Sequence, residues 1–361
     1  MKLHLILSAL AASFAVVLAA TPSNETTSSV LRVLDDEDEG GEDGGDGGSD
    51  TGGDDRTLQN VMSVFDYNNQ YRRGSYDKVT ALQGCQKENK WSEGPIAPYH
   101  EDVSFVFRGP MDIYNIAIFS TDGDRGWVAQ STYNRDSGAN NMVFMNNANP
   151  QKFNGLSPQG YASADGVDFS REPVHFGGRL EDGRDPDNQW GGPGITTGAE
   201  VNIMRPDRCD DGSCDGYYDP AYGLQGWSGS KVFAAKVKMD RGGIPAIWML
   251  NAQVIRANQY GCNCRGMADP GGCGEFDIAE AIYHGTDTLA THDYYLNLKP
   301  SANGHDTWAI RPIDGVATIV GVWDIGTGVI KVLQMSGDDF DFFDRDVVSY
   351  GEMNREVIFR Q

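Results

Sequence analysis

Three carboxylates stand within six residues of one another, at Glu275, Asp277 and Glu280. Only Phe, Ile and Ala separate them, whereas acids on a solvated loop are usually mixed with Gly, Ser, Lys or Asn. Acids that alternate with apolar residues predict a β-strand with one acidic and one apolar face. Such a face is costly unless it lines a site where the acids act on a ligand.

The spacing of the three acids predicts a strand with one irregularity. Side chains alternate along a strand, so Glu275 and Asp277 share a face while Phe276 points into the core. Glu280 would point away from the other acids in a regular strand. A β-bulge at Ile278-Ala279 would return Glu280 to the acidic face, and bulges are common beside active sites.

A row of this kind could cleave a glycosidic bond. Two carboxyl groups that flank the bond can act as nucleophile and as acid/base, which is what glycoside hydrolysis requires. A third acid between them could hold a proton or orient the first. Crowding also separates the pKa values of such acids, so that one stays protonated while another is ionised.

The acidic motif resembles the catalytic strand of glycoside hydrolase family 16 in its bulged, endo-β-1,3-glucanase form. The wider sequence resembles the fungal Tos-type cell-wall proteins, which are related to that family, over residues from about 60 to 350. The segments that carry this second resemblance are 107–110, 143–147, 161–166, 245–253, 259–262 and 273–277. The resemblance implies that Glu275 is the nucleophile, that Asp277 assists it and that Glu280 is the acid/base.

Two further residues take a possible role from the resemblance. The counterpart of Trp248 stands near the reacting sugar in the family, and a sugar ring can stack on an indole. His292 resembles a histidine on the strand after the catalytic one, where it could contact Asp277 or the sugar. A core Trp and a half-buried His are the structural alternatives.

Other residues could bind sugar by their type and context. Asn251 and Gln253 follow the predicted Trp248 strand and could hydrogen-bond sugar hydroxyls, although polar residues also end strands without a ligand. Trp190 and Trp227 lie in loop-like sequence, where a large apolar ring could serve as a sugar platform.

The chain divides into three parts by composition. Residues 1–20 have one lysine, a short apolar run and small residues at the end, which predicts a secretory signal peptide. Residues 21–56 hold twelve acids and two arginines and almost nothing apolar after position 35, which predicts a disordered segment. Residues 57–361 have the composition of a globular domain, and a segment of this length can bury one large hydrophobic core.

The predicted fold of residues 57–361 is an all-β, antiparallel β-sandwich of the jelly-roll type with long loops. Short alternating runs separated by Gly, Pro, Asn and Asp are typical of this fold. Residues 150–230 contain few such runs, so we expect long loops there. The runs are 103–107, 113–119, 127–130, 232–239, 247–250, 318–322 and 330–335.

The chain contains six cysteines, an even count that predicts disulfides in a secreted protein. Cys209 should pair with Cys214. Cys273 should pair with Cys262 or Cys264, and Cys85 would take the remaining cysteine. A zinc site at the last three cysteines is the less favoured alternative.

The net charge of −23 disfavours nucleic acid and anionic membranes as partners and is compatible with a neutral polysaccharide. We expect no cofactor and no metal. The sequence therefore predicts a secreted or cell-wall monomer that hydrolyses β-1,3-glucan with retention. A glucan transglycosylase and a non-catalytic wall protein that binds carbohydrate remain the alternatives, and linkage preference is left open.

Overall fold

The structure is a computed structural model that describes residues 62–67, 71–146, 160–166, 168–182, 200–210, 212–265, 272–296, 303–336 and 339–361. All of these residues belong to one compact unit, Asp50–Gln361. The predicted signal peptide and acidic segment lie outside the described residues.

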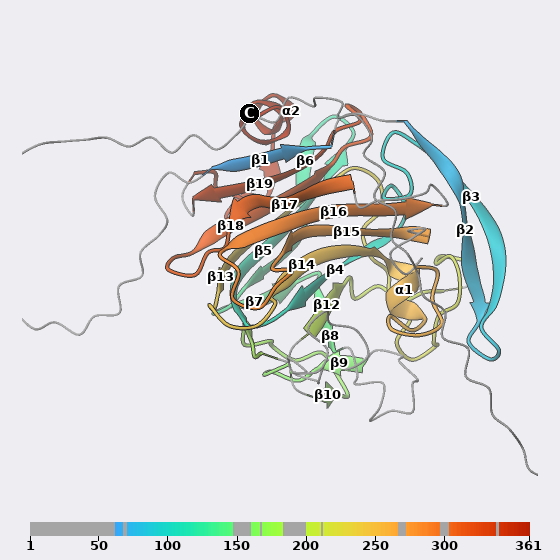
Figure 1. Ribbon diagram of the computed structural model, residues 1–361. Coiled ribbons are helices and arrows are strands. Elements are labelled where there is room, and N and C mark those ends of the chain that lie inside the picture. Colours follow the sequence, from blue (N-terminus) through green and yellow to red (C-terminus); the bar gives the residue numbers. More distant parts are fainter. Residues whose placement is uncertain are drawn as a thin grey trace, which may run out of the picture. The chain divides into compact units, whose positions relative to one another are not determined.

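Two antiparallel sheets of nine strands each form the body of this unit (Figure 1). The first sheet has the strand order β1-β19-β18-β13-β5-β6-β20, with β11 on β5 and β7 on β6. Its strands are β1 Ser63–Asp66, β5 Met111–Asp122, β6 Gly126–Asn134, β7 Gly138–Asn140, β11 Arg179–Leu180, β13 Lys231–Met239, β18 Ala317–Trp323, β19 Ile330–Ser336 and β20 Val347–Val348.

The second sheet has the order β10-β9-β8-β12-β4-β14-β15-β16-β17 and contains the acidic strand. Its strands are β4 Val103–Arg108, β8 Val143–Asn146, β9 Gly160–Ala162, β10 Phe169–Ser170, β12 Glu200–Met204, β14 Ala246–Asn251, β15 Gly272–Glu280, β16 Thr288–Leu296 and β17 Asn303–Ile310.

A separate hairpin and three short helical segments complete the described fold. The hairpin joins β2 Arg72–Ala81 to β3 Gln86–Gly94, and β2 contacts both β15 and β16. The helical segments are α1 Ala252–Arg256, α2 Tyr350–Met353 and the π-helical turn Asn354–Ile358. In Figure 1 the hairpin stands beside α1, away from the first sheet.

A continuous apolar core between the two sheets holds them together. Phe105 of β4 stacks on Phe233 of β13 with ring centroids 4.3 Å apart, and both side chains are fully buried. Alternation explains this, because every second residue of each strand faces the other sheet. The expected antiparallel β-sandwich is therefore confirmed.

The expectation of long loops over residues 150–230 is wrong in part. Residues 200–204 form β12, a central strand between β8 and β4 whose five residues are all buried. The Gly-, Pro- and Asp-rich flanks of this short run hide it in the sequence.

The two ends of the described fold meet in the first sheet. β1 pairs with β19, so that Phe65 lies opposite Val332 (Figure 1). Lys331 of β19 forms an ion pair with Asp66 at 3.5 Å, and its ammonium donates to the carbonyl oxygens of Ile358 and Arg360, each at 2.9 Å. One buried lysine thus binds both ends.

Candidate active site

The acidic strand β15 contains the predicted bulge. Trp248 of β14 pairs with Asp277, and the next residue, Ile247, pairs with Ala279, so that Ile278 is the extra residue. Ile278 and Ala279 both lie in the core between the sheets. Two consecutive residues on one side restore the alternation, which places Glu280 on the face of Asp277.

The three acids therefore gather on the face of β15 that is turned away from the core, and Phe276 lies in the core as predicted. We name Glu275, Asp277 and Glu280 the carboxylate row. Asp277 is 6% exposed, whereas the side chains of Glu275 and Glu280 each keep 21% of their surface. The two outer acids are thus the accessible members of the row.

Burial sets the charge of the middle acid. The loss of solvation, followed by the charges of Glu280 and Glu275, raises the pKa of Asp277 well above its ordinary value. The nearby guanidinium groups of Arg108 and Arg265 oppose this rise without cancelling it. Asp277 therefore keeps its proton at pH values where an exposed aspartate is ionised.

Each outer carboxylate is paired with an arginine. Arg108 of β4 places Nη2 3.0 Å from Oε1 of Glu280, and Arg265 places Nη1 3.0 Å from Oε2 of Glu275. Both arginine side chains are less than one-tenth exposed. Each arginine therefore places a positive charge beside one of the outer carboxyl groups. Neither arginine is apparent from the motif, because their distances along the chain give no hint of the pairing.

Two hydroxyl groups brace the backbone of the carboxylate row from the core side. Thr291 donates its hydroxyl to the carbonyl oxygen of Asp277 at 2.7 Å. The Tyr99 hydroxyl lies 2.9 Å from the carbonyl oxygen of Glu275 and 2.5 Å from Asp293 Oδ1. These contacts fix the strand on both sides of Phe276, so the carboxyl groups project from a rigid support.

The neighbouring strand β16 contributes His292 and Tyr294. His292 pairs with Asp277 across the ladder, as the resemblance implies, and its Nε2 lies 2.9 Å from Asp306 Oδ1. Tyr294 pairs with Glu275. Burial first, and then the charges of the row, raise the pKa of the Tyr294 hydroxyl. That hydroxyl therefore stays protonated and can act as a hydrogen-bond donor, a role that the sequence did not indicate.

Trp248 lies beside the carboxylate row on β14. It pairs with Asp277, is 3% exposed, and has the Arg108 guanidinium 5.4 Å from its ring. Among the residues that the structure describes, its indole Nε1 has no hydrogen-bond partner. The ring lies beside Asp277 but is almost fully buried, so in this conformation it offers little surface on which a sugar could stack.

Three of the predicted sugar-binding residues, Trp227, Asn251 and Gln253, are buried in other parts of the described fold. Trp227 is 3% exposed in the core between the sheets, where its indole donates to Ser131 Oγ at 3.0 Å, so the expectation of a sugar platform is wrong. Trp190 lies outside the described residues.

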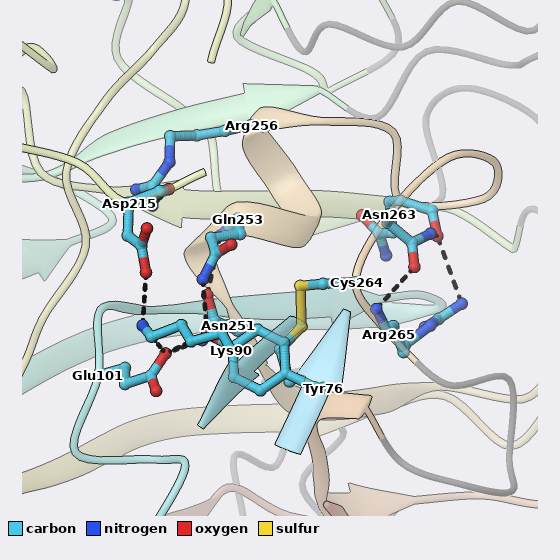
Figure 2. The surroundings of a disulfide bond; sticks show 12 residues. Tyr76, Lys90, Glu101, Asp215, Asn251, Gln253, Arg256, Asn263, Cys264 and Arg265 are labelled. Carbon is cyan, nitrogen blue, oxygen red and sulfur yellow. Dashed lines mark hydrogen bonds and ion pairs between the residues drawn. A yellow bond between two sulfur atoms is a disulfide. The ribbon is translucent and has the colours of Figure 1, made fainter. Parts of the chain in front are cut away.

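Asn251 and Gln253 are buried in a polar network beneath the β2–β3 hairpin (Figure 2). Asn251 donates to Glu101 at 3.1 Å and caps α1, while Gln253 donates to the Tyr76 hydroxyl at 2.9 Å. These contacts give both side chains a structural role, and direct contact with sugar remains a prediction without support from their position.

A fourth carboxylate was missed in the sequence. Glu200 of β12 pairs across the ladder with Arg108 and is 2% exposed. It accepts hydrogen bonds from the Tyr260 hydroxyl at 2.6 Å and from Gln259 Nε2 at 2.9 Å. The alternation of Glu200 and Asn202 with apolar residues was the available signal. This network gives the arginines of the site a further negative neighbour.

Three groups of the site are close enough to consider a metal. Ligand atoms of Asp277, Glu280 and His292 lie within 4.8 Å of one another. Glu280 is already paired with Arg108, and Asp277 holds a proton, so the donors are poorly prepared for a cation. We assign no metal to this group.

Three disulfides join the described cysteines, and they match the predicted pattern. Cys209 bonds to Cys214, Cys264 bonds to Cys273, and Cys85 bonds to Cys262. The second of these resolves the alternative left open by the sequence. No cysteine is left for a zinc site, since all six are bonded.

The fold and the bonded cysteines define a disulfide-linked all-β sandwich with an acidic bulged strand. Two family models match this chain: the C-terminal part of cell wall protein YJL171C/Tos1 at residues 125–351, and the N-terminal part at residues 63–121. The chain therefore belongs to the YJL171C/Tos1 family of cell wall proteins, which confirms the expected Tos-type family. Family membership and the disulfides fit a secreted or cell-wall location.

Several curated relatives share the name "Probable circularly permuted 1,3-beta-glucanase". One from Arthroderma benhamiae is 27% identical over 297 residues, which are 77% of this chain and 62% of the relative. YJL171C of Saccharomyces cerevisiae is 27% identical over 238 residues, 57% of this chain and 56% of the relative. TOS1 of Candida albicans is 29% identical over 248 residues, 61% of this chain and 47% of the relative.

The chain thus spans from about half to three-fifths of the length of these relatives. No solved structure matches it. Within the described residues, no helix is long and apolar enough to cross a membrane.

Proposed function

We propose that this protein is a glycoside hydrolase that cleaves β-1,3-glucan with retention of configuration. The observation that carries the proposal is the bulged strand, which turns three acids onto one face and buries the middle one between two accessible ones. The names of the relatives support β-1,3-glucan as the substrate.

In the proposed reaction Glu275 is the nucleophile. Its carboxylate attacks the anomeric carbon, the glycosidic bond breaks, and a glycosyl ester forms on Glu275. The exposure of the Glu275 side chain, 21%, supports this role, because a nucleophilic carboxylate has to reach the anomeric carbon. Water then attacks the ester and releases the sugar with its original configuration.

Glu280 is the proposed acid/base. It gives a proton to the leaving oxygen in the first step and takes a proton from water in the second. In the first step Glu280 must hold a proton that it can give to the leaving oxygen. The buried, protonated Asp277 lies next to it and is the proposed source of that proton, and the proton that Glu280 later takes from water returns to Asp277.

The test is to incubate purified protein with laminarin-type oligosaccharides and to identify the products by mass and by the anomeric configuration in NMR. The expected products are shorter β-glucans with retained configuration. Longer products would indicate transglycosylation, and oligosaccharides that bind without any change would indicate the non-catalytic alternative.

The decisive variant is Glu275→Gln, which keeps the shape of the side chain and removes the nucleophile. We expect a loss of several orders of magnitude in turnover with an unchanged melting temperature, because no glycosyl ester can form. Glu172→Gln, an exposed site on another part of the chain, is the control. Near-normal turnover in Glu275→Gln would refute the assignment.

A further inference from the structure

Arg265 is held in place by more contacts than an ordinary surface ion pair has. Its side chain is 9% exposed and its Nη1 lies 3.0 Å from Glu275 Oε2. The guanidinium also lies 5.7 Å from the ring centre of Tyr260. A planar guanidinium held on two sides gives its partner a fixed direction, which a mobile lysine would not.

The backbone that carries Arg265 is anchored at neighbouring positions (Figure 2). Cys262 is bonded to Cys85 at the tip of the β2–β3 hairpin, and Cys264 is bonded to Cys273 at the start of β15. One disulfide therefore ties the segment to the strand that contains Glu275, and the other ties it to the hairpin.

Asn263, between the two bonded cysteines, locks the turn. Its Oδ1 accepts the backbone N–H of Arg265 at 2.8 Å, while its Nδ2 donates to the carbonyl oxygens of Asn258 and Gln259 at 2.8 and 2.9 Å. Asn263 is 4% exposed, so these bonds are sheltered from water. The position of the Arg265 backbone is thereby determined independently of its ion pair.

We propose that Arg265 is the positioning residue for Glu275: the anchored segment holds the guanidinium against one carboxylate oxygen and so directs the other oxygen toward the sugar. The inference rests on the proposed function and deepens it. A displacement of about 1 Å at a reacting group can cost about 100-fold in rate, which is why a fixed arginine at this position matters.

The charged and titratable groups around Glu275 bear on this role. Tyr294 faces it from β16, and Asp277 stands next to it in the row. Arg265 itself is within electrostatic reach of Tyr260 and Glu200. Arg265 is the cation that pairs with Glu275, so its replacement by a neutral residue removes that ion pair.

The test compares Arg265→Gln and Arg265→Lys with the wild type on laminarin-type oligosaccharides. We expect Arg265→Gln to lower kcat by about 100-fold while KM changes by less than about threefold. The Glu275 carboxylate would no longer be oriented toward the anomeric carbon, whereas the contacts that bind the sugar would remain. Arg265→Lys should recover only part of kcat. Lysine keeps the positive charge but lacks the planar guanidinium that fixes the direction of the contact. Arg241→Gln, which breaks an exposed ion pair with Asp287, is the control.

A second measurement does not depend on activity. Crystal structures of the wild type and of Arg265→Gln at one pH should show Glu275 in a single conformer in the former and turned or in several conformers in the latter. An unmoved Glu275 would overturn the proposal, as would an unchanged kcat or a raised KM with unchanged kcat. A wild type that cleaves no glucan would refute the proposed function, and the crystal comparison would then decide the positioning role alone.

Discussion

Asp277 and Glu280 lie on the same face of β15 although three steps of the chain separate them. The partner strands take only two steps over the same length, from Trp248 to Ala246 on one side and from His292 to Ala290 on the other. Over this length β15 therefore has one residue more than each of its partner strands. It follows that the strand could lose one residue here and still satisfy both neighbours.

Deletion of Ala279 should therefore be tolerated. The remaining sequence would alternate regularly, with Ile278 toward the core and Glu280 still in the carboxylate row. We expect a folded protein with a modestly lower melting temperature and measurable glucan cleavage. Deletion of both Ile278 and Ala279 should instead turn Glu280 into the core, at a cost of several kcal/mol. Equal behaviour of the two deletions would contradict the bulge.

Replacement of Asp277 should change how stability depends on pH. The raised pKa of Asp277 means that the folded protein keeps a proton which the unfolded chain loses above about pH 4, so stability falls as pH rises from there. Asp277→Asn resembles the protonated acid and has no such proton to lose. Its stability relative to wild type should therefore increase with pH, by about 1.4 kcal/mol for each unit of raised pKa.

Urea unfolding between about pH 4 and about pH 7 measures this difference. Asp314→Asn is the matched control, because Asp314 is exposed and lies outside the candidate site. A constant difference between Asp277→Asn and wild type across this range would show that Asp277 is ionised in the folded protein.

The acidic motif predicted more of the site than any other part of the sequence. The alternation of acids and apolar residues required a strand, and the odd spacing of Glu280 required a bulge. Both follow from the period of two, which a single sequence displays directly. The apolar runs predicted most of the central strands for the same reason.

The partners of the carboxylate row could not be predicted in this way. Arg108 ends a strand 172 residues before Glu280, and Arg265 stands outside any strand. A charged residue has the same sequence signature whether it is solvated or paired inside the fold. Trp227 shows the reverse case, because a loop-like context concealed a core position.

Trp227→Phe should lower stability without changing sugar binding. Loss of the larger ring and of the hydrogen bond to Ser131 removes core packing, with an expected cost of about 1–3 kcal/mol. KM for glucan oligosaccharides should stay at the wild-type value. A raised KM with unchanged stability would restore Trp227 as a sugar platform. Denaturant unfolding and steady-state kinetics on the same preparation distinguish these outcomes.

The three disulfides should contribute unequally to stability. Cys85 and Cys262 are 177 residues apart, whereas Cys209 and Cys214 are 5 apart. Restriction of the unfolded chain predicts about 5 kcal/mol for the first bond and about 2 kcal/mol for the second. The Cys85→Ser/Cys262→Ser protein should therefore melt well below the Cys209→Ser/Cys214→Ser protein in thermal scans. The opposite order would show that the hairpin stays in place without its covalent bond.

Lys331 holds the two ends of the described fold close together. Because this one side chain contacts Asp66 near the first described strand and the carbonyl oxygens of Ile358 and Arg360 at the other end, the ends form a common seam. A short peptide that joined the two ends of the described fold would close residues 62–361 into a ring. The ring could then be opened at an exposed turn such as 123–125 with the strand pairing kept. The same sandwich could therefore form from a chain in which these strands follow one another in a different order.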